Sequence, residues 1–131
     1  MATGTIHKGK VLLWNNSSPT TAFAGQNISV STVGYDQVQI VFMMNRTTYV
    51  CYSLIMDIGT PSTDEKTYAV NTFMNFDASS ALLVVRRNAE AYSSYVLFGD
   101  CKKKTTTATS AATVDNNYLI PLQIYGIRYQ L

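Results

Sequence analysis

The stretch YLIPLQIYGIRY, residues 118–129, decides the fold prediction, because nearly every position carries a β-branched, aromatic or other apolar side chain. Successive side chains of a β-strand point to opposite faces. One predicted face holds Tyr118, Ile120, Leu122 and Ile124. The other holds Leu119, Gln123, Tyr125, Ile127 and Tyr129. Both faces are largely apolar, and the chain's own core can cover only one of them.

The second apolar face predicts a contact with a further partner, either another layer of the fold or another subunit. We expect the final strand to be central to the fold and to lie near an oligomer contact that includes Tyr125, Ile127 and Tyr129. Pro121 has no backbone N–H to donate, so it predicts a bulge, an interruption or a sheet edge at that point.

Strand patterns recur along the rest of the chain, separated by turn residues, and helical spacing is nearly absent. The predicted strands before the final one cover residues 10–15, 26–31, 37–44, 47–56, 67–76, 81–86 and 92–101. About eight short strands at near-regular spacing predict an all-β fold, an antiparallel β-sandwich of the jelly-roll or Greek-key kind. The length of 131 residues fits one domain, residues 1–131.

The predicted sandwich core takes one face of each inner strand. Its expected members are Val38, Ile40, Phe42, Leu82, Val84, Val96 and Phe98. Asn88-Ala89-Glu90 is predicted to be a turn, and residues 102–117 a long loop or weak edge strand. Cys51 and Cys101 lie within apolar strands and are expected to be buried, reduced thiols.

Charge is sparse, because only 14% of residues are charged and the net charge is +2. This balance argues against a nucleic-acid partner. Lys102-Lys103-Lys104 is the one basic cluster, and it is expected to be a solvated loop. No segment has the length or apolarity of a transmembrane helix or a secretory signal, so we expect no membrane insertion and synthesis in a cytoplasm.

No pattern typical of an enzyme is present. His7 stands alone near the N-terminus, and one histidine with two distant cysteines does not form a zinc site. The sequence has no glycine-rich phosphate loop and no nucleophile elbow. We therefore expect no catalytic residues, no metal and no cofactor.

Aromatic residues are in excess, with nine Tyr, five Phe and one Trp. A tyrosine ring can stack on a sugar while its hydroxyl forms hydrogen bonds with the sugar's substituents. The candidates near predicted turns are Tyr35, Tyr92, Tyr95 and Tyr118, with Trp14 next to a loop. The alternative is that these rings pack in the core or at a subunit contact.

Several motifs taken in order resemble one family. The stretches that carry the resemblance are Leu13-Trp14-Asn15-Asn16-Ser17-Ser18-Pro19, Phe23-Ala24, Gln26-Asn27-Ile28-Ser29-Val30, Gly34-Tyr35-Asp36 and Ile120-Pro121-Leu122-Gln123-Ile124-Tyr125-Gly126-Ile127. They resemble a small module of phage and prophage structural proteins, which stands at the C-terminus of tail-fibre, head-fibre and tail-tip proteins. The resemblance implies a β-sandwich head domain, usually trimeric, that displays loops for host-surface recognition. It supplies no shared binding residues.

The resulting expectation is a non-enzymatic virion protein, made in the bacterial host cytoplasm, that binds host cell-surface carbohydrate as a homotrimer. The alternative is a capsid-decoration or tail-assembly subunit without a ligand. Family members often follow a fibrous shaft, and here almost nothing precedes the first strand. The chain is thus expected to be either an excised head domain or a short free-standing virion protein.

Overall fold

The computed structural model of the chain describes residues 7–45, 50–59, 67–75, 82–105 and 111–130. Every regular element within these residues is a β-strand. The strands are β1 (His7–Asn15), β2 (Gln26–Ser29), β3 (Gln37–Asn45), β4 (Cys51–Asp57), β5 (Thr67–Asn75), β6 (Leu82–Ala91), β7 (Tyr95–Phe98), β8 (Lys102–Thr105), β9 (Thr113–Val114) and β10 (Tyr118–Gln130).

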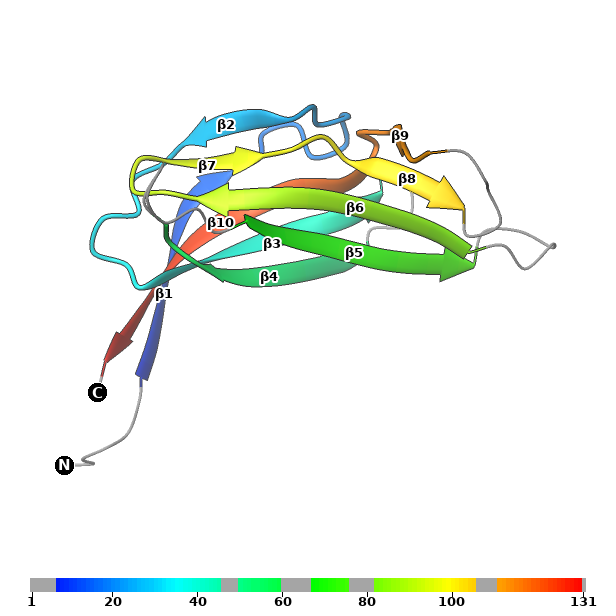
Figure 1. Cartoon of the computed structure of the whole chain (residues 1–131). Coiled ribbons are helices and arrows are strands. Elements are labelled where there is room, and N and C mark those ends of the chain that lie inside the picture. Colours follow the sequence, from blue (N-terminus) through cyan, green and yellow to red (C-terminus); the bar gives the residue numbers. More distant parts are fainter. Residues whose placement is uncertain (1–6, 46–49, 60–66, 76–81, 106–110, 131) are drawn as a thin grey trace.

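The strands form two antiparallel sheets that face each other as a sandwich (Figure 1). The four-stranded sheet has the order β1-β10-β3-β4. In the six-stranded sheet, the order is β2-β7-β6-β8-β9, and β5 pairs with β6. Because β7 and β8 pair with successive parts of β6, they act as one strand broken at residues 99–101. The predicted all-β sandwich is confirmed.

The six-stranded sheet contains three strands that are neighbours both in the chain and in space. There β5, β6 and β7 are consecutive antiparallel neighbours, and β2 lies beside β7. In the other sheet β10 lies between β1 and β3. The final strand is therefore central, as its composition predicts.

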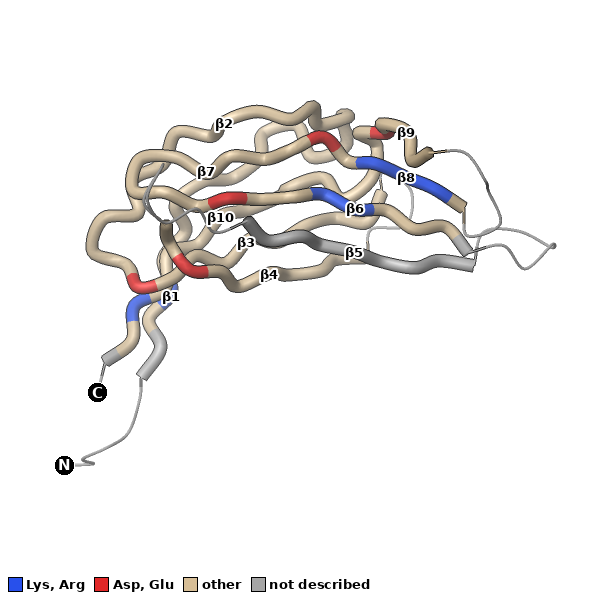
Figure 2. Tube along the Cα trace, viewed as in Figure 1, with Lys and Arg blue, Asp and Glu red and all other residues tan. Residues whose placement is uncertain are grey.

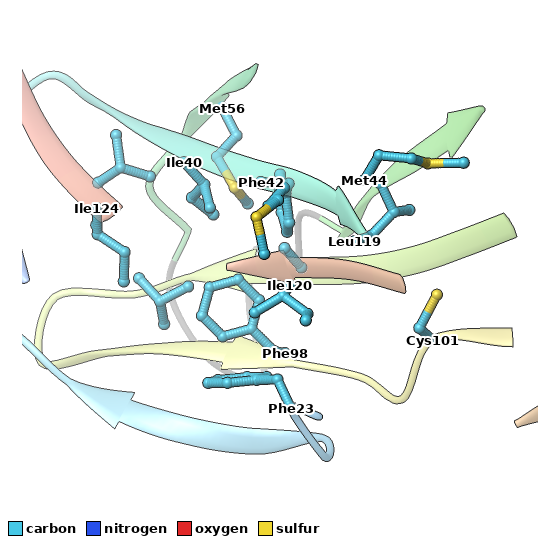
Figure 3. Packing of buried hydrophobic residues seen from close by; sticks show 14 of the residues in the cluster. Phe23, Ile40, Phe42, Met44, Met56, Phe98, Cys101, Leu119, Ile120 and Ile124 are labelled. Carbon is cyan, nitrogen blue, oxygen red and sulfur yellow. The ribbon is translucent and has the colours of Figure 1, made fainter. Parts of the chain in front are cut away.

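The core lies between the sheets (Figure 3). Val38, Ile40 and Phe42 of β3 are fully buried, as the alternation predicts. The ring of Phe42 meets that of Phe98 on β7 edge to face, with 6.1 Å between centroids. Phe98 in turn contacts Phe23 in the same way at 5.5 Å. These edge-to-face contacts join the two layers and add to the burial of apolar surface.

The sequence-based prediction for β6 is wrong in two respects. The predicted turn at Asn88-Ala89-Glu90 lies within β6, which continues to Ala91. The core face of β6 includes Leu83 and Val85, whereas the predicted Val84 is only half-buried. The side chain of Leu82 lies outside the described residues. Since residues 82–85 are all apolar, a period of two could not select the inner face.

β10 has the predicted irregularity at its proline. Its pairing with β3 shifts register between Pro121 and Gln123. The expected alternation fails there, because Leu119 and Ile120 are neighbours in sequence and are both fully buried. Leu119 also has a φ of 46°, in the left-handed region, which is energetically unfavourable for a residue with a side chain.

A buried arginine holds this irregular segment. Arg87 of β6 is fully buried, and its Nε donates to the carbonyl of Leu119 at 2.8 Å. Its Nη1 donates to the carbonyl of Gly99 at 2.8 Å, and its Nη2 to that of Tyr118 at 3.1 Å. The ring of Phe23 lies 5.5 Å from the guanidinium carbon. Burial lowers the pKa of Arg87. The side chain thus connects the two sheets and supports the break between β7 and β8.

The two cysteines differ in their surroundings, and the prediction of burial is wrong for Cys51. Cys51 is exposed, since it lies at the start of β4, the edge strand of its sheet. Cys101 is buried, and this burial raises its pKa to about 11.

We expect one fast-reacting thiol in the native chain. At pH 8 the thiol of Cys101 stays protonated and shielded, so a thiol-specific disulfide reagent should label only Cys51 until denaturant is added. Cys51→Ser should abolish the fast reaction, and Cys101→Ser should leave it intact. Two fast thiols in the native wild type would contradict the placement of Cys101.

Candidate functional site

The outer face of the four-stranded sheet is the first candidate surface. In the register of the sheet, one row crosses all four strands and consists of Leu12, Tyr125, Gln39 and Ile55. Leu12 and Ile55 are 48% and 40% exposed. Large apolar side chains at both edges of a sheet face leave apolar surface in contact with water, which is typical of interaction sites.

Polar groups on this face are largely paired with one another. Tyr129 Oη donates to Gln37 Oε1 at 2.6 Å, and Gln37 Nε2 donates to Asp57 Oδ1 at 3.0 Å. Tyr125 Oη donates to Gln123 Oε1 at 2.7 Å, and the ammonium of Lys10 lies 4.0 Å from the centroid of the Tyr125 ring. Covering these side chains would therefore leave few polar atoms without partners.

A groove marks one end of the same sheet. It has a volume of about 450 Å³. Its lining is Asn15, Asn16, Pro19, Thr20, Val41, Met43, Cys51, Leu122 and Gln123. This lining contains no Asp, Glu, Lys, Arg or His. The groove is thus suited to an apolar or neutral polar surface.

Asn16 joins the first and last motifs of the chain at this groove. Its backbone N–H donates to the carbonyl of Leu122, and its Nδ2 donates to that of Pro121, each at 2.8 Å. The Asn16 Oδ1 accepts the N–H of Ser18 at 2.8 Å, which fixes the start of the loop. The bulge at Pro121 thereby exposes carbonyls that the asparagine uses.

The predicted contact residues on β10 differ in accessibility. Tyr129 is exposed and Tyr125 is half-buried, so both can gain burial in an assembly. Ile127 is fully buried within the single chain, so the expectation that it becomes more buried in an oligomer is wrong. Leu12 and Ile55 were not predicted as contact residues, although Leu12 lies in a recognisable apolar run.

The four candidate sugar-binding tyrosines do not form one site. Tyr35 and Tyr95 are half-buried near the same end of the sandwich, where Tyr92 contacts Tyr95 with 4.9 Å between centroids. Tyr92 is only 4% exposed, so its prediction as an exposed ligand-binding residue is wrong. Tyr118 pairs with Asn45, at the opposite end of β3 from the Tyr35 loop.

Local packing explains why the rings of Tyr35 and Tyr118 are not free to stack on a sugar. The ring of Tyr35 lies against Gly126 and is 5.3 Å from the guanidinium carbon of Arg128. Tyr118 is half-buried, with the ammonium of Lys103 5.7 Å from its ring centroid. Trp14 is also half-buried and contacts Phe23 edge to face. Their aromatic surfaces mainly serve the fold.

No cluster of three or more potential metal ligands occurs among the residues that the structure describes. Within the same ranges, no helix could cross a membrane. Comparison of the chain with protein-family models, curated proteins and solved structures finds no match.

Proposed function

We propose that this chain is a structural domain of a phage virion that assembles with copies of itself, as a trimer, and presents its loops to host-surface carbohydrate. The observation that carries the assembly is the outer face of the four-stranded sheet. Its exposed apolar edges and paired polar groups match the core of a protein interface. The motif resemblance supports the virion, the trimer and the attachment role.

The paired ends of β1 and β10 support assembly independently. They project from the body of the sandwich as a two-stranded ribbon (Figure 1). Beyond the last pairing of β10 with β3, the ribbon pairs residues 7–9 with residues 128–130, and the side chain of Tyr129 within it is 39% exposed. A two-stranded ribbon alone is marginally stable in water, so contact with another copy would stabilise it.

Charges placed on this face should dissociate the assembly. In light scattering, the wild type is expected at three times the 14.5 kDa mass of one chain, and Leu12→Glu/Ile55→Glu at the monomer mass. Both positions are exposed, so the fold should lose less than about 1 kcal/mol. Tyr125→Ser should weaken assembly before it unfolds the domain.

Val33→Glu provides the matched control, because Val33 is 73% exposed in a loop outside the sheet face. This variant should keep the wild-type mass. A wild type that is monomeric at micromolar concentration would reject the assembly, and a double variant that remains oligomeric would reject this face.

A virion subunit without a ligand is the second candidate function. It is favoured by the separation of the tyrosines, since Tyr92 is buried and Tyr118 lies far from Tyr35. Binding to a glycan array and to host cells separates the candidates. An oligomer that binds neither is a decoration or tail-assembly subunit, whereas saturable glycan binding supports the receptor-binding domain.

A further inference from the structure

A second surface of the molecule concentrates positive charge. It lies on β8 and the adjacent part of β6 (Figure 2). The lysine run 102–104, expected in a solvated loop, instead forms most of β8. Strand alternation divides the run, because Lys102 and Lys104 are exposed whereas the ammonium of Lys103 binds Asp115 Oδ2 at 2.8 Å.

Arg86 adds a cation directly across from this run. Val85 and Arg87 on either side of it are buried, so Arg86 faces outward. It pairs in register with Lys102 on β8, and like charges at such positions destabilise a pair of strands. Among the described residues, neither side chain forms an ion pair within 4 Å. The sequence of the adjacent β5, TYAVNTFMN, contains no charged residue.

These side chains surround a pocket. It has a volume of about 180 Å³ and is lined by Arg86, Asn88, Asp100 and Lys102. Asn88 contributes an amide, which can donate hydrogen bonds to an anion's oxygens. Lys104 is exposed two residues along β8 from Lys102, on the same face. The hydrogen-bond donors around the pocket thus outnumber its one carboxylate, that of Asp100.

Asp100 is held by other groups. Its Oδ1 accepts the backbone N–H of Gly25 at 2.7 Å and the Nδ2 of Asn116 at 3.0 Å. The hydrogen bond from Gly25, then that from Asn116, lowers the pKa of Asp100, so this carboxylate stays ionised at neutral pH. It offsets one of the three positive charges of Arg86, Lys102 and Lys104, and the surface keeps a positive balance.

We propose that this pocket binds a carboxylate or phosphate group of an acidic polysaccharide. An anion between Arg86 and Lys102 would remove their mutual repulsion and satisfy both cations. The small pocket fits one anionic group, and none of its lining residues is aromatic, which disfavours a single-stranded nucleic acid. This inference rests on the proposed function, because it names the class of host carbohydrate.

Binding by the full chain should be measured calorimetrically against polygalacturonate, long-chain polyphosphate and neutral dextran. We expect binding to one or both acidic polymers, weakened by salt, and none to dextran. The acidic polymer that binds more tightly identifies the preferred anion as carboxylate or phosphate. Arg86→Gln/Lys102→Gln should weaken binding about tenfold without lowering the melting temperature, because the substitution also removes the repulsion between the two cations.

Lys103→Gln is the matched control, since the neighbouring lysine lies outside the pocket and pairs with Asp115. Its affinity should stay within about twofold of wild type. The proposed anion site would be wrong if Lys102→Gln and Lys103→Gln weakened binding equally. It would also be wrong if duplex DNA bound as tightly as the polysaccharide. An oligomer that binds only neutral host glycans would reject the pocket and leave the proposed function standing. Monomers that bind acidic polymer through Arg86 would keep the pocket and reject the assembly.

Discussion

Arg87→Met is expected to lower the free energy of unfolding by about 3–5 kcal/mol, because one buried and two partly buried carbonyls lose their donor at once. Methionine fills a similar volume but donates no hydrogen bond. Small domains have only about 5–15 kcal/mol of stability, so the variant should be close to unfolding. Urea denaturation followed by circular dichroism measures the shift of the midpoint.

Arg86→Met is the matched control, since it makes the same change one residue earlier on the exposed face. It should change stability by less than about 0.5 kcal/mol. Arg87→Lys keeps the charge, but its single ammonium cannot reach three carbonyls. Its free energy of unfolding should therefore lie between those of Arg87→Met and wild type. Equal effects of Arg86→Met and Arg87→Met would show that the carbonyl contacts contribute little.

Gly126→Ala is expected to cost about 1–3 kcal/mol through a steric clash. A Cβ at this position would lie 2.6 Å from two carbons of the Tyr35 ring. The guanidinium of Arg128 is also close to the ring, and its Nε donates to the carbonyl of Gly34 at 2.9 Å. The ring therefore has little room to withdraw. Thermal unfolding of the purified variant measures the loss.

A double-mutant cycle tests the cause of this loss. In a Tyr35→Ala background the clash is absent, and alanine is more favourable than glycine within a strand. Gly126→Ala should then be neutral or stabilising. If the substitution costs the same in both backgrounds, the strain has another source and the Tyr35 contact is not what requires glycine.

The sequence predicts a strand's inner face well where polar residues mark its outer face. In β3, Gln37 and Gln39 alternate with Val38 and Ile40, and the buried set follows directly. In β6 the apolar run does not show which face is buried. That depends on the adjacent Arg86 and Arg87, one of which must turn inward. Sequence patterns place an arginine in water by default, so they could not predict that β10 supplies carbonyls to bury Arg87.

The candidate sites were harder to predict, because ring exposure depends on which loop meets which strand. Tyr35 follows a turn, a position that favours exposure, yet its ring covers Gly126, which lies 91 residues away in sequence. Glycine within a strand pattern is a signal of close approach by another group, and it could have indicated such a partner. The cationic pocket arises from cross-strand register, which the lysine run alone does not reveal.

The central position of β10 has a consequence for the order of folding. Its partners are β1, near the start of the sequence, and β3, so His7 lies opposite Gln130 in the sheet. A ribosome delivers residues 118–130 last among the described strands, and until then β1 and β3 have no strand between them. Contacts so distant in sequence make folding slow and leave unpaired strand edges exposed during synthesis. The six-stranded sheet, whose β5, β6 and β7 are consecutive neighbours, can form its pairings earlier.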